Sequence, residues 1–373
     1  MQEELNQFER NDVWELVPCP PSQTIIGTKC IFRNKLDVQC NTVRNKVRLV
    51  AQGYYQEEGI DYDETFVPVA KLVTVRLLIA IAAPRSWELH QMDIKSAFLN
   101  GFLNEEVFVE QPKGFQDPHK PNHVFKLKKA LYGLKQAPRA WYERLAEFLL
   151  HVGFQRGSVD KTLFIKKEKQ HLVIAQVYVD DIVFGSTSDF LKDEFVKSMS
   201  STFEMSLVGE LNFFLGLQIK QMPDGIFITQ NKYAKNLVKR FGLDNKKHMK
   251  TPMGTNEKLS KDESGTPIYP TLYRSMIGSL LYLTASRPDI SYSVCVFARY
   301  QSCPKESHLK VVKIIIRYIN GTTKLGILYS SDTNTNLAGF SDADWAGDVD
   351  DRKNTTGGCF YLGNNLVSRY SKK

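Results

Sequence analysis

The feature that most constrains this chain is a predicted strand hairpin whose second apolar run contains two adjacent aspartates. The first strand covers residues 162–165, and the second run extends from Leu172 to Gly185 with Asp180 and Asp181 in its middle. Neighbouring strand residues point to opposite faces, so both carboxylates can reach one point only where the ribbon bends sharply. Two charges in an apolar run are costly without a metal ion or a partner. The pattern predicts a functional site here; the alternative is a simple turn between two shorter strands.

A third aspartate, Asp93, lies at the end of another short predicted strand, residues 89–94. Phosphoryl transfer by two divalent metals about 4 Å apart needs two or three carboxylates that converge on one spot. Full-charge oxygen ligands suit Mg²⁺. Asp93, Asp180 and Asp181 are therefore candidates for such a site, although Asp93 could instead cap a helix over residues 94–99.

The composition is that of a folded protein with a modest excess of positive charge. With 42% hydrophobic and 24% charged residues, the 373-residue chain can bury two or three packed units. The net charge of +8 fits a polyanionic partner but is also common among proteins that bind none. The cations concentrate in two stretches, at Lys29, Arg33, Lys35, Arg44, Lys46 and Arg48, and at Lys120, Lys126, Lys128, Lys129, Lys135 and Arg139.

Cysteine spacing and hydropathy indicate where such a chain works. The six cysteines are scattered and none is paired as C-x-x-C, which argues against a disulfide framework and against a zinc knuckle. The N-terminal residues lack the apolar core of a signal peptide. No stretch approaches the roughly 18 consecutive apolar residues of a membrane span. We expect an intracellular protein that is neither secreted nor inserted in a membrane.

The remaining patterns predict a mixture of helices and strands, an α+β fold. Helical patterns cover residues 1–18, 73–83, 140–152, 189–203, 232–241 and 272–320. Strand patterns cover a basic hairpin at 25–53 with a turn near 38–41, paired strands at 211–220 and 225–230, and strands within 326–362 around a turn at 348–353. The polar segment 244–271 is the best candidate for a linker.

Several long motifs in a fixed order closely resemble the polymerase of copia-type long-terminal-repeat retrotransposons. They are MDIKSAFLNG at 92–101, LYGLKQAPRAWY at 131–142, YVDD at 178–181, TFVPV at 65–69, FLGL at 214–217 and SDADWAG at 341–347. The resemblance implies a right-hand polymerase of fingers, palm and thumb, with an antiparallel palm sheet. It implies fingers and palm over residues 1–195, thumb and connection over 196–335, and a partial ribonuclease H-like α/β segment over 336–373.

The resemblance also assigns roles to residues around the nucleotide. It implies two Mg²⁺ ions, with Mn²⁺ as an alternative, held by Asp93, Asp180, Asp181 and the carbonyl group of Ile94. It implies a triphosphate clamp at Lys46 and Arg48, an aromatic gate under the sugar at Phe98, and a nucleotide contact at Gln136. From the residues alone, Phe98 is equally a core side chain, and a solvated hairpin face is the favoured interpretation of the two cations.

Template and primer positions follow in the same way. Lys135 and Arg139 either line the template or are solvated, and Phe214, Leu215 and Gly216 resemble a tight turn that grips the primer, although the bare pattern fits a buried strand. Asp342 resembles the first metal-binding carboxylate of ribonuclease H. The family's later carboxylates lie beyond Lys373, so the resemblance implies a truncated domain without strand cleavage.

The resemblance implies an RNA-directed DNA polymerase. Its partners would be an RNA template, a DNA primer, their hybrid, deoxynucleoside triphosphates and the rest of a Pol polyprotein, in a cytoplasmic virus-like particle or the nucleus. The alternative is a degenerate, silent nucleic-acid-binding fragment, which departures from the family pattern at Cys30, Val47 and Arg369 favour. A two-metal nuclease would explain the carboxylates but not the order of the motifs.

Overall fold

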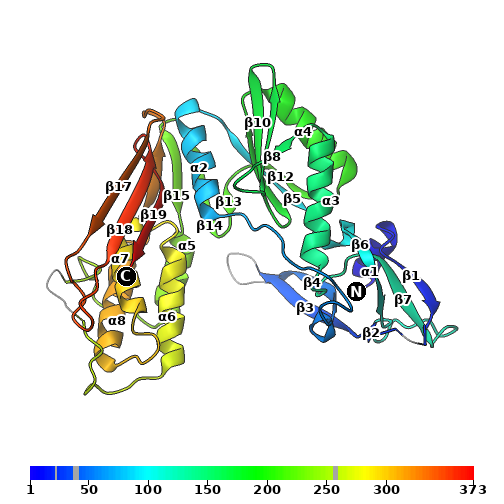
Figure 1. The fold of residues 1–373 in the computed structure, drawn as a ribbon, viewed down its shortest axis with the longest axis horizontal. Coiled ribbons are helices and arrows are strands. Elements are labelled where there is room, and N and C mark those ends of the chain that lie inside the picture. The colour runs from blue at the N-terminus through cyan, green and yellow to red at the C-terminus, as the bar shows by residue number, and fades with distance from the viewer. Residues whose placement is uncertain (22, 37–41, 255–258) are drawn as a thin grey trace. The chain divides into compact units, whose positions relative to one another are not determined.

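The computed structural model of the protein describes residues 1–21, 23–36, 42–254 and 259–373, in two compact units (Figure 1). The first unit combines residues 1–70 with 91–209, and the second combines 71–90 with 210–373. Both units contain helices and mainly antiparallel strands, which is consistent with the predicted α+β class.

The first unit is built on two sheets and a long hairpin. Its helical elements are α1 (Gln2–Arg10), η1 (Gly53–Tyr55), η3 (Ala97–Asn100), α3 (Ala137–His151) and α4 (Asp189–Thr202). Its strands are β1 (Trp14–Pro18), β2 (Ile25–Ile26), β3 (Thr28–Leu36), β4 (Thr42–Ala51), β5 (Leu89–Ile94), β6 (Phe102–Val109), β7 (His123–Lys129), β8 (Gln155–Arg156), β9 (Leu163–Glu168), β10 (His171–Tyr178), β11 (Asp181–Ser186) and β12 (Met205–Glu210).

The six-stranded sheet, in the order β12-β5-β11-β10-β9-β8, carries the candidate carboxylates. Strand β5 lies beside β11, so residues almost ninety positions apart in sequence become neighbours. Helices α3 and α4 pack on this sheet (Figure 1). In α3, Trp141, Leu145 and Leu149 are buried at the four-residue spacing of an amphipathic helix, and Pro138 stands in its first turn.

The N-terminal segment differs from its predicted helix. Helix α1 ends at Arg10, and Trp14–Pro18 forms strand β1, which pairs antiparallel with β7. The ring of Trp14 stacks between those of Phe8 and Phe125. The partner strand lies more than a hundred residues away in sequence, so a local helical pattern could not reveal this pairing. The predicted basic hairpin is present as β3 and β4, while its turn near 38–41 lies outside the described residues.

The second unit combines a helical cluster with two sheets. Its helical elements are α2 (Leu72–Ala82), η2 (Ala83–Arg85), α5 (Asn231–Arg240), α6 (Pro270–Leu283), η4 (Pro288–Ile290), α7 (Ser291–Ala298) and α8 (Glu306–Gly321). Its strands are β13 (Phe213–Phe214), β14 (Leu217–Met222), β15 (Gly225–Thr229), β16 (Gly326–Ser330), β17 (Leu337–Ala343), β18 (Thr356–Leu362) and β19 (Asn365–Lys372). Strand β19 had no counterpart among the sequence predictions.

Helices α5 to α8 share one apolar core that includes Leu237, Ile277, Phe297 and Ile316. The strands form two antiparallel sheets, β13-β14-β15-β16 and β17-β18-β19. None of the helices in the described ranges is both long and apolar enough to cross a membrane.

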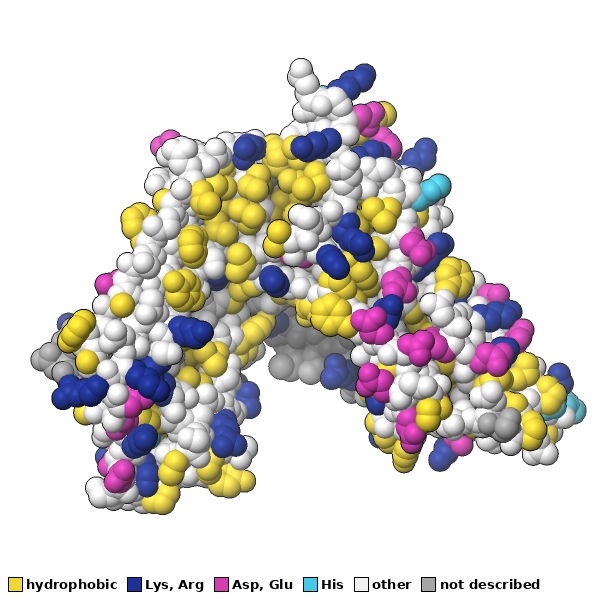
Figure 2. Space-filling model, in the orientation of Figure 1, with side chains coloured by type: hydrophobic (Ala, Val, Ile, Leu, Met, Phe, Trp, Pro, Cys, Tyr) yellow, Lys and Arg dark blue, Asp and Glu magenta, His cyan; other side chains and the backbone are white. Residues whose placement is uncertain are grey.

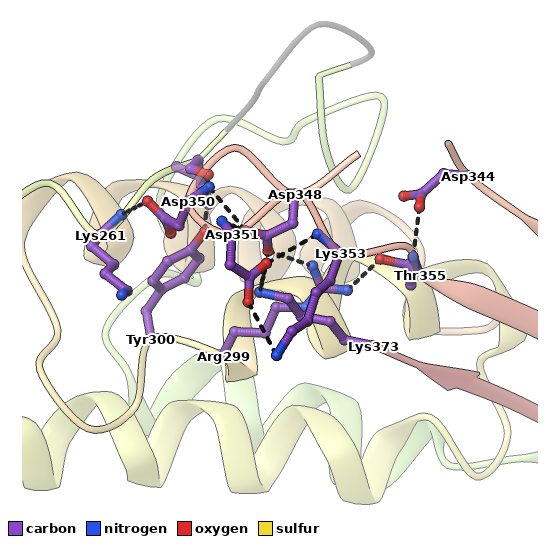
Figure 3. A network of polar contacts seen from close by, with 11 residues as sticks. Lys261, Arg299, Tyr300, Asp344, Asp348, Asp350, Asp351, Lys353, Thr355 and Lys373 are labelled. Atoms are coloured by element: carbon purple, nitrogen blue, oxygen red, sulfur yellow. Dashed lines mark hydrogen bonds and ion pairs between the residues drawn. The ribbon is translucent and has the colours of Figure 1, made fainter. Parts of the chain in front are cut away.

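A polar network holds the loop between β17 and β18 (Figure 3). The nearly buried carboxylate of Asp348 accepts hydrogen bonds from Arg299 at 3.1 Å and from the backbone of Asp350 at 3.0 Å, and pairs with Lys373 at 2.6 Å. Burial alone would raise the pKa of Asp348, but the hydrogen bonds and the charge of Lys373 outweigh it and lower the pKa to about 2. The loop is therefore anchored by a carboxylate that stays ionised.

Candidate active site

The two adjacent aspartates lie at a tight turn between β10 and β11. Tyr178 pairs with Asp181 across the hairpin, so Val179 and Asp180 form a two-residue turn. Val179 has φ +56°, a left-handed conformation that a β-branched residue seldom adopts. The predicted second run is thus two shorter strands joined by a turn, as the alternative interpretation proposed, and the chain bends sharply at the two aspartates. Backbone strain of this kind tends to collect at functional sites.

Trp141 holds this turn from helix α3. Its indole Nε1–H donates a hydrogen bond of 2.6 Å to the carbonyl oxygen of Val179, and the Trp141 side chain is 1% exposed. This bond fixes the peptide that joins Val179 to Asp180. Sequence reasoning did not single out Trp141, although it lies within the motif at 131–142.

We expect Trp141→Phe to lower the free energy of unfolding by about 2 kcal/mol, because it leaves the Val179 carbonyl without its indole donor and opens a small cavity at the buried position of Trp141. Val179→Gly, which removes the side chain that disfavours the positive φ, should change stability by less than about 1 kcal/mol. Urea unfolding of both variants measures this. Equal losses in the two variants would show that the indole hydrogen bond does not support the turn.

Asp93 lies on β5, beside the hairpin. The amide of Ile94 donates to the carbonyl oxygen of Asp180 at 2.9 Å, which joins this strand directly to the turn, and Ser206 donates to the carbonyl of Asp93 at 3.1 Å. A short 3-10 helix begins only at Ala97. Asp93 is therefore a strand residue, and the alternative of a helix cap is wrong.

The three carboxylates influence one another electrostatically. Burial, followed by the charges of Asp180 and Asp93, raises the pKa of Asp181 to about 6. Burial also raises the pKa of Asp180; the charge of Asp93 adds to this, while Arg48 and Lys46 oppose it. The protein thus concentrates negative charge where it cannot be fully solvated, an arrangement typical of sites that bind cations.

The donor set suits an oxygen-seeking divalent cation, because a cation would relieve the repulsion by Asp93 that helps to raise the pKa of Asp180 and that of Asp181. Within the described ranges, no group of three or more His, Cys, Asp and Glu side chains has the geometry of a ready-made metal site. The chemistry of the ligands fits Mg²⁺, while their arrangement here is not that of a closed coordination shell.

The two cations predicted to clamp a triphosphate, Lys46 and Arg48, lie on β4. The positive charges of Lys46 and Arg48 both lower the pKa of Asp180. The guanidinium carbon of Arg48 lies 4.7 Å from the centroid of the Tyr132 ring. The structure therefore brings these predicted cations and the predicted carboxylates into one region of the first unit.

Phe98 follows β5 on η3 and is partly buried. It lines a small, mostly apolar cavity together with Val67, Pro138, Trp141 and Val179. Its ring contacts that of Tyr132 with centroids 5.1 Å apart. The predicted gate residue is thus adjacent to the turn that carries the carboxylates, and its ring packs against that of Tyr132.

Gln136 is engaged within the protein. It is 3% exposed, and its Oε1 accepts a hydrogen bond of 3.0 Å from Nε2 of Gln56. The same Gln56 accepts from the backbone amide of Lys135 at 2.9 Å. This side chain, which the resemblance assigns to the nucleotide, joins the start of α3 to the segment after β4.

The second basic stretch is largely paired with acids and carbonyl groups. Lys135 donates to the carbonyl of Gln56 at 2.8 Å, and Arg139 bridges Glu64 at 2.6 Å and Glu143 at 2.7 Å. On strand β7, Lys126 pairs with Glu106, and Lys128 pairs with Asp12. Acidic and basic side chains also lie side by side on the face of the first unit seen in Figure 2. Positive charge here is mainly balanced locally.

The segment proposed to grip a primer forms a tight turn in the second unit. Phe214 pairs with Leu217, and Leu215 and Gly216 between them have φ +50° and +77°. Positive φ at both central residues is typical of a type I′ hairpin turn. Tyr282 on α6 donates to the carbonyl of Leu215 at 3.0 Å, and a Cβ at position 216 would collide with its hydroxyl. Glycine is therefore required there.

Asp342 lies on β17 and is exposed. It lines an open pocket with Asp344, Thr355, Arg369 and Tyr370. Arg369 donates to the carbonyl groups of Pro288 and Thr284, both at 2.8 Å, and burial is the main cause that lowers its pKa to about 10. The departure at position 369 thus places a partly buried cation in the same pocket as Asp342 and Asp344.

Comparison with known proteins places these features in a family. Residues 11–255 match the reverse transcriptase (RNA-dependent DNA polymerase) family. The chain is 43% identical over its whole length to the retrovirus-related Pol polyprotein from transposon RE1 of Arabidopsis thaliana, of which it covers 26%, and 35% identical to that from transposon TNT 1-94 of Nicotiana tabacum, of which it covers 29%. It is also 30% identical, over 72% of its length, to 87% of the putative transposon Ty5-1 protein YCL074W of Saccharomyces cerevisiae. The chain spans about a quarter of the length of the first of these polyproteins.

Proposed function

Because this chain belongs to the reverse transcriptase family of copia-type retrotransposon Pol polyproteins, we propose that it is an RNA-directed DNA polymerase that extends a primer on an RNA or DNA template. The observation that carries the proposal is the strained Val179–Asp180 turn, which holds Asp180 and Asp181 within electrostatic range of Asp93, with Lys46 and Arg48 of β4 close enough to act on Asp180. A module that only bound nucleic acid would gain nothing from three partly buried carboxylates.

Asp93, Asp180, Asp181 and the carbonyl group of Ile94 would hold the metal. Two Mg²⁺ ions, or Mn²⁺ in their place, would supply activation of the primer hydroxyl and charge neutralisation of the triphosphate when bound. Lys46 and Arg48 bind the triphosphate oxygens, since cations on a hairpin beside the carboxylates suit that anion. Phe98 excludes a 2′-hydroxyl by occupying the space under the sugar. Gln136, which is held by its hydrogen bond with Gln56, contacts the nucleotide.

Template and primer contacts complete the proposal. Lys135 and Arg139 line the template, and Phe214, Leu215 and Gly216 support the primer end through their rigid turn. We assign residues 1–195 to fingers and palm, with strands β5, β8, β9, β10 and β11 of the six-stranded sheet in the palm. We assign 196–335 to thumb and connection, and 336–373 to a ribonuclease H-like segment in which Asp342 is a metal-binding carboxylate. The partners are an RNA template, a DNA primer, their hybrid, deoxynucleoside triphosphates and the remainder of a Pol polyprotein. The site of action is a cytoplasmic virus-like particle or the nucleus.

The decisive test compares the chain with Asp180→Asn in extension of a labelled DNA primer on an RNA template, with Mg²⁺ and deoxynucleotides. We expect extension by the unmodified chain and none above background by the variant, because the substitution removes a metal-binding charge while preserving shape. Duplex binding by both proteins, measured at several salt concentrations, should be similar, since phosphate contacts dominate affinity for nucleic acid.

Two outcomes would contradict the proposal. Equal extension by both proteins would show that Asp180 is not part of the catalytic site. Salt-sensitive binding of the duplex without extension by either protein would identify the chain as a binding remnant of a polymerase.

A further inference from the structure

The aromatic ring of Tyr132 connects two parts of the proposed nucleotide site. The guanidinium group of Arg48 lies over one side of it, at 4.7 Å from the centroid. Phe98 packs against it with centroids 5.1 Å apart and an angle of 54° between the rings. A single side chain therefore contacts both the residue proposed to bind the triphosphate and the residue proposed to face the sugar.

The backbone around Tyr132 fixes its ring against the C-terminal end of strand β4. The carbonyl of Tyr132 accepts a hydrogen bond of 2.7 Å from the amide of Ala51, three residues after Arg48. The next residue, Gly133, has φ +95°, and a Cβ there would lie 2.2 Å from the Ala51 carbonyl oxygen. The close approach of the two chains leaves Tyr132 little freedom to move away from β4.

The ring also lies within the field of the carboxylates. Burial raises the pKa of Tyr132 to about 12; Arg48 opposes this, while Asp180, Glu4 and Asp93 add to it. The phenol is therefore neutral at physiological pH, and the face of its ring attracts the guanidinium group of Arg48. A long Arg side chain on a hairpin would otherwise sample many rotamers and lose that freedom on binding an anion.

We propose that Tyr132 is a positioning residue that sets nucleotide affinity and sugar selectivity, by holding Arg48 through a cation–π contact and by supporting Phe98 from behind. This inference rests on the proposed polymerase function. It extends that function by naming a residue whose effect is on the binding of the deoxynucleoside triphosphate and not on the chemical step.

The first experiment measures single-nucleotide incorporation by the full chain and by Tyr132→Phe and Tyr132→Leu. The Phe variant retains the aromatic face, so its KM for dTTP should match that of the unmodified chain. The Leu variant should raise KM roughly tenfold with kcat nearly unchanged, the size expected from one partly desolvated cation–π contact. Its preference for dTTP over UTP should also fall, because Phe98 loses its support. Thermal melting of each variant separates these effects from a folding defect.

A second experiment keeps the inference testable if no incorporation occurs. Binding of dTTP with Ca²⁺, which does not require chemistry, is measured by calorimetry on the complex with primer and template. We expect the dissociation constant to rise roughly tenfold in Tyr132→Leu and to stay unchanged in Tyr132→Phe. Binding of dTTP without incorporation would contradict the polymerase proposal while leaving the role of Tyr132 supported.

Three results would overturn the inference. These are an unchanged KM and dissociation constant in Tyr132→Leu, an equal loss in Tyr132→Phe and Tyr132→Leu, or no dTTP binding by the unmodified chain. In an Arg48→Gln background, the Tyr132→Leu substitution should have a much smaller effect on KM, since the two side chains then no longer interact. Full additivity of the two substitutions would likewise contradict a contact between them.

Discussion

Asp181→Asn should abolish primer extension and at the same time stabilise the metal-free protein. The loss of activity follows from the proposed metal site, where removal of one carboxylate costs about 4 kcal/mol of transition-state stabilisation, roughly a thousandfold in rate. The gain in stability follows from the electrostatics of the turn. In the metal-free protein the charge of Asp181 destabilises the folded state, because it is partly buried near Asp180 and Asp93.

The sign of the stability effect follows from proton linkage. The pKa of Asp181 is raised by burial and by its acidic neighbours to about 6 in the folded protein, above its usual value of about 3.9 in an unfolded chain. Folding is therefore disfavoured once the group ionises, and this cost develops as the pH rises from about 4 through about 6. The Asn variant should be equal to the unmodified chain below pH 4 and more stable by about 2 kcal/mol at pH 7. A shift of about two pKa units corresponds to about 3 kcal/mol, and solvent screening of the partly exposed carboxylate reduces this.

Urea unfolding in chelator at pH 4 and pH 7 measures this, together with primer extension in Mg²⁺. Asp193→Asn, an exposed position on α4, is the matched control and should change neither quantity. If Asp181→Asn loses activity without gaining stability at pH 7, the charge of Asp181 does not destabilise the folded protein.

The sequence indicated which residues of the site are chemically unusual, and the fold explains why they meet. Charges within an apolar run were visible at Asp180 and Asp181, and the bend needed to use both is present at Val179. The helices at 189–203 and 232–241 were predicted close to their observed bounds, because each shows a periodic apolar face. Local patterns of this kind are sufficient for elements that a short segment specifies by itself.

Contacts between distant residues could not be predicted in this way. The hydrogen bond from Trp141 to the turn, the pairing of Gln56 with Gln136, and the Arg48–Tyr132 contact each join segments that are far apart in sequence. Single residues in a motif carry no information about which backbone atom they approach. The strand β1 was missed for the same reason, since its partner β7 lies far along the chain.

The largest effect on stability should come from a buried ion pair in the second unit. Arg287 is 1% exposed, and its guanidinium group binds both carboxylate oxygens of Asp289, at 2.9 and 2.7 Å. Two further hydrogen bonds reach the carbonyl and hydroxyl oxygens of Thr322, just after α8. Tyr318 donates to the same carboxylate at 2.9 Å. Four hydrogen bonds within the protein therefore compensate the charge of Arg287.

Arg287→Leu should lower the free energy of unfolding by about 3 kcal/mol or more, because removal of one partner leaves a partly buried carboxylate and the Thr322 acceptors uncompensated. Arg287→Lys should lose less, since it retains the charge but not the two-pronged geometry. Lys310→Ala removes an exposed pair on α8, with Glu306 at 3.9 Å, and should cost about 0.5 kcal/mol or less.

The pH dependence gives an independent check on this mechanism. Burial alone would raise the pKa of Asp289, but the hydrogen bond and charge of Arg287 outweigh it and hold the pKa below its usual value. The stabilisation is thus present above about pH 3.9 and is lost as the pH falls through the lowered value. The difference between the unmodified chain and Arg287→Leu should accordingly shrink in acid. Hydrogen exchange of the α8 amides at pH 7 and at acid pH measures this locally, and a difference that is independent of pH would mean that packing, and not the ion pair, stabilises the second unit.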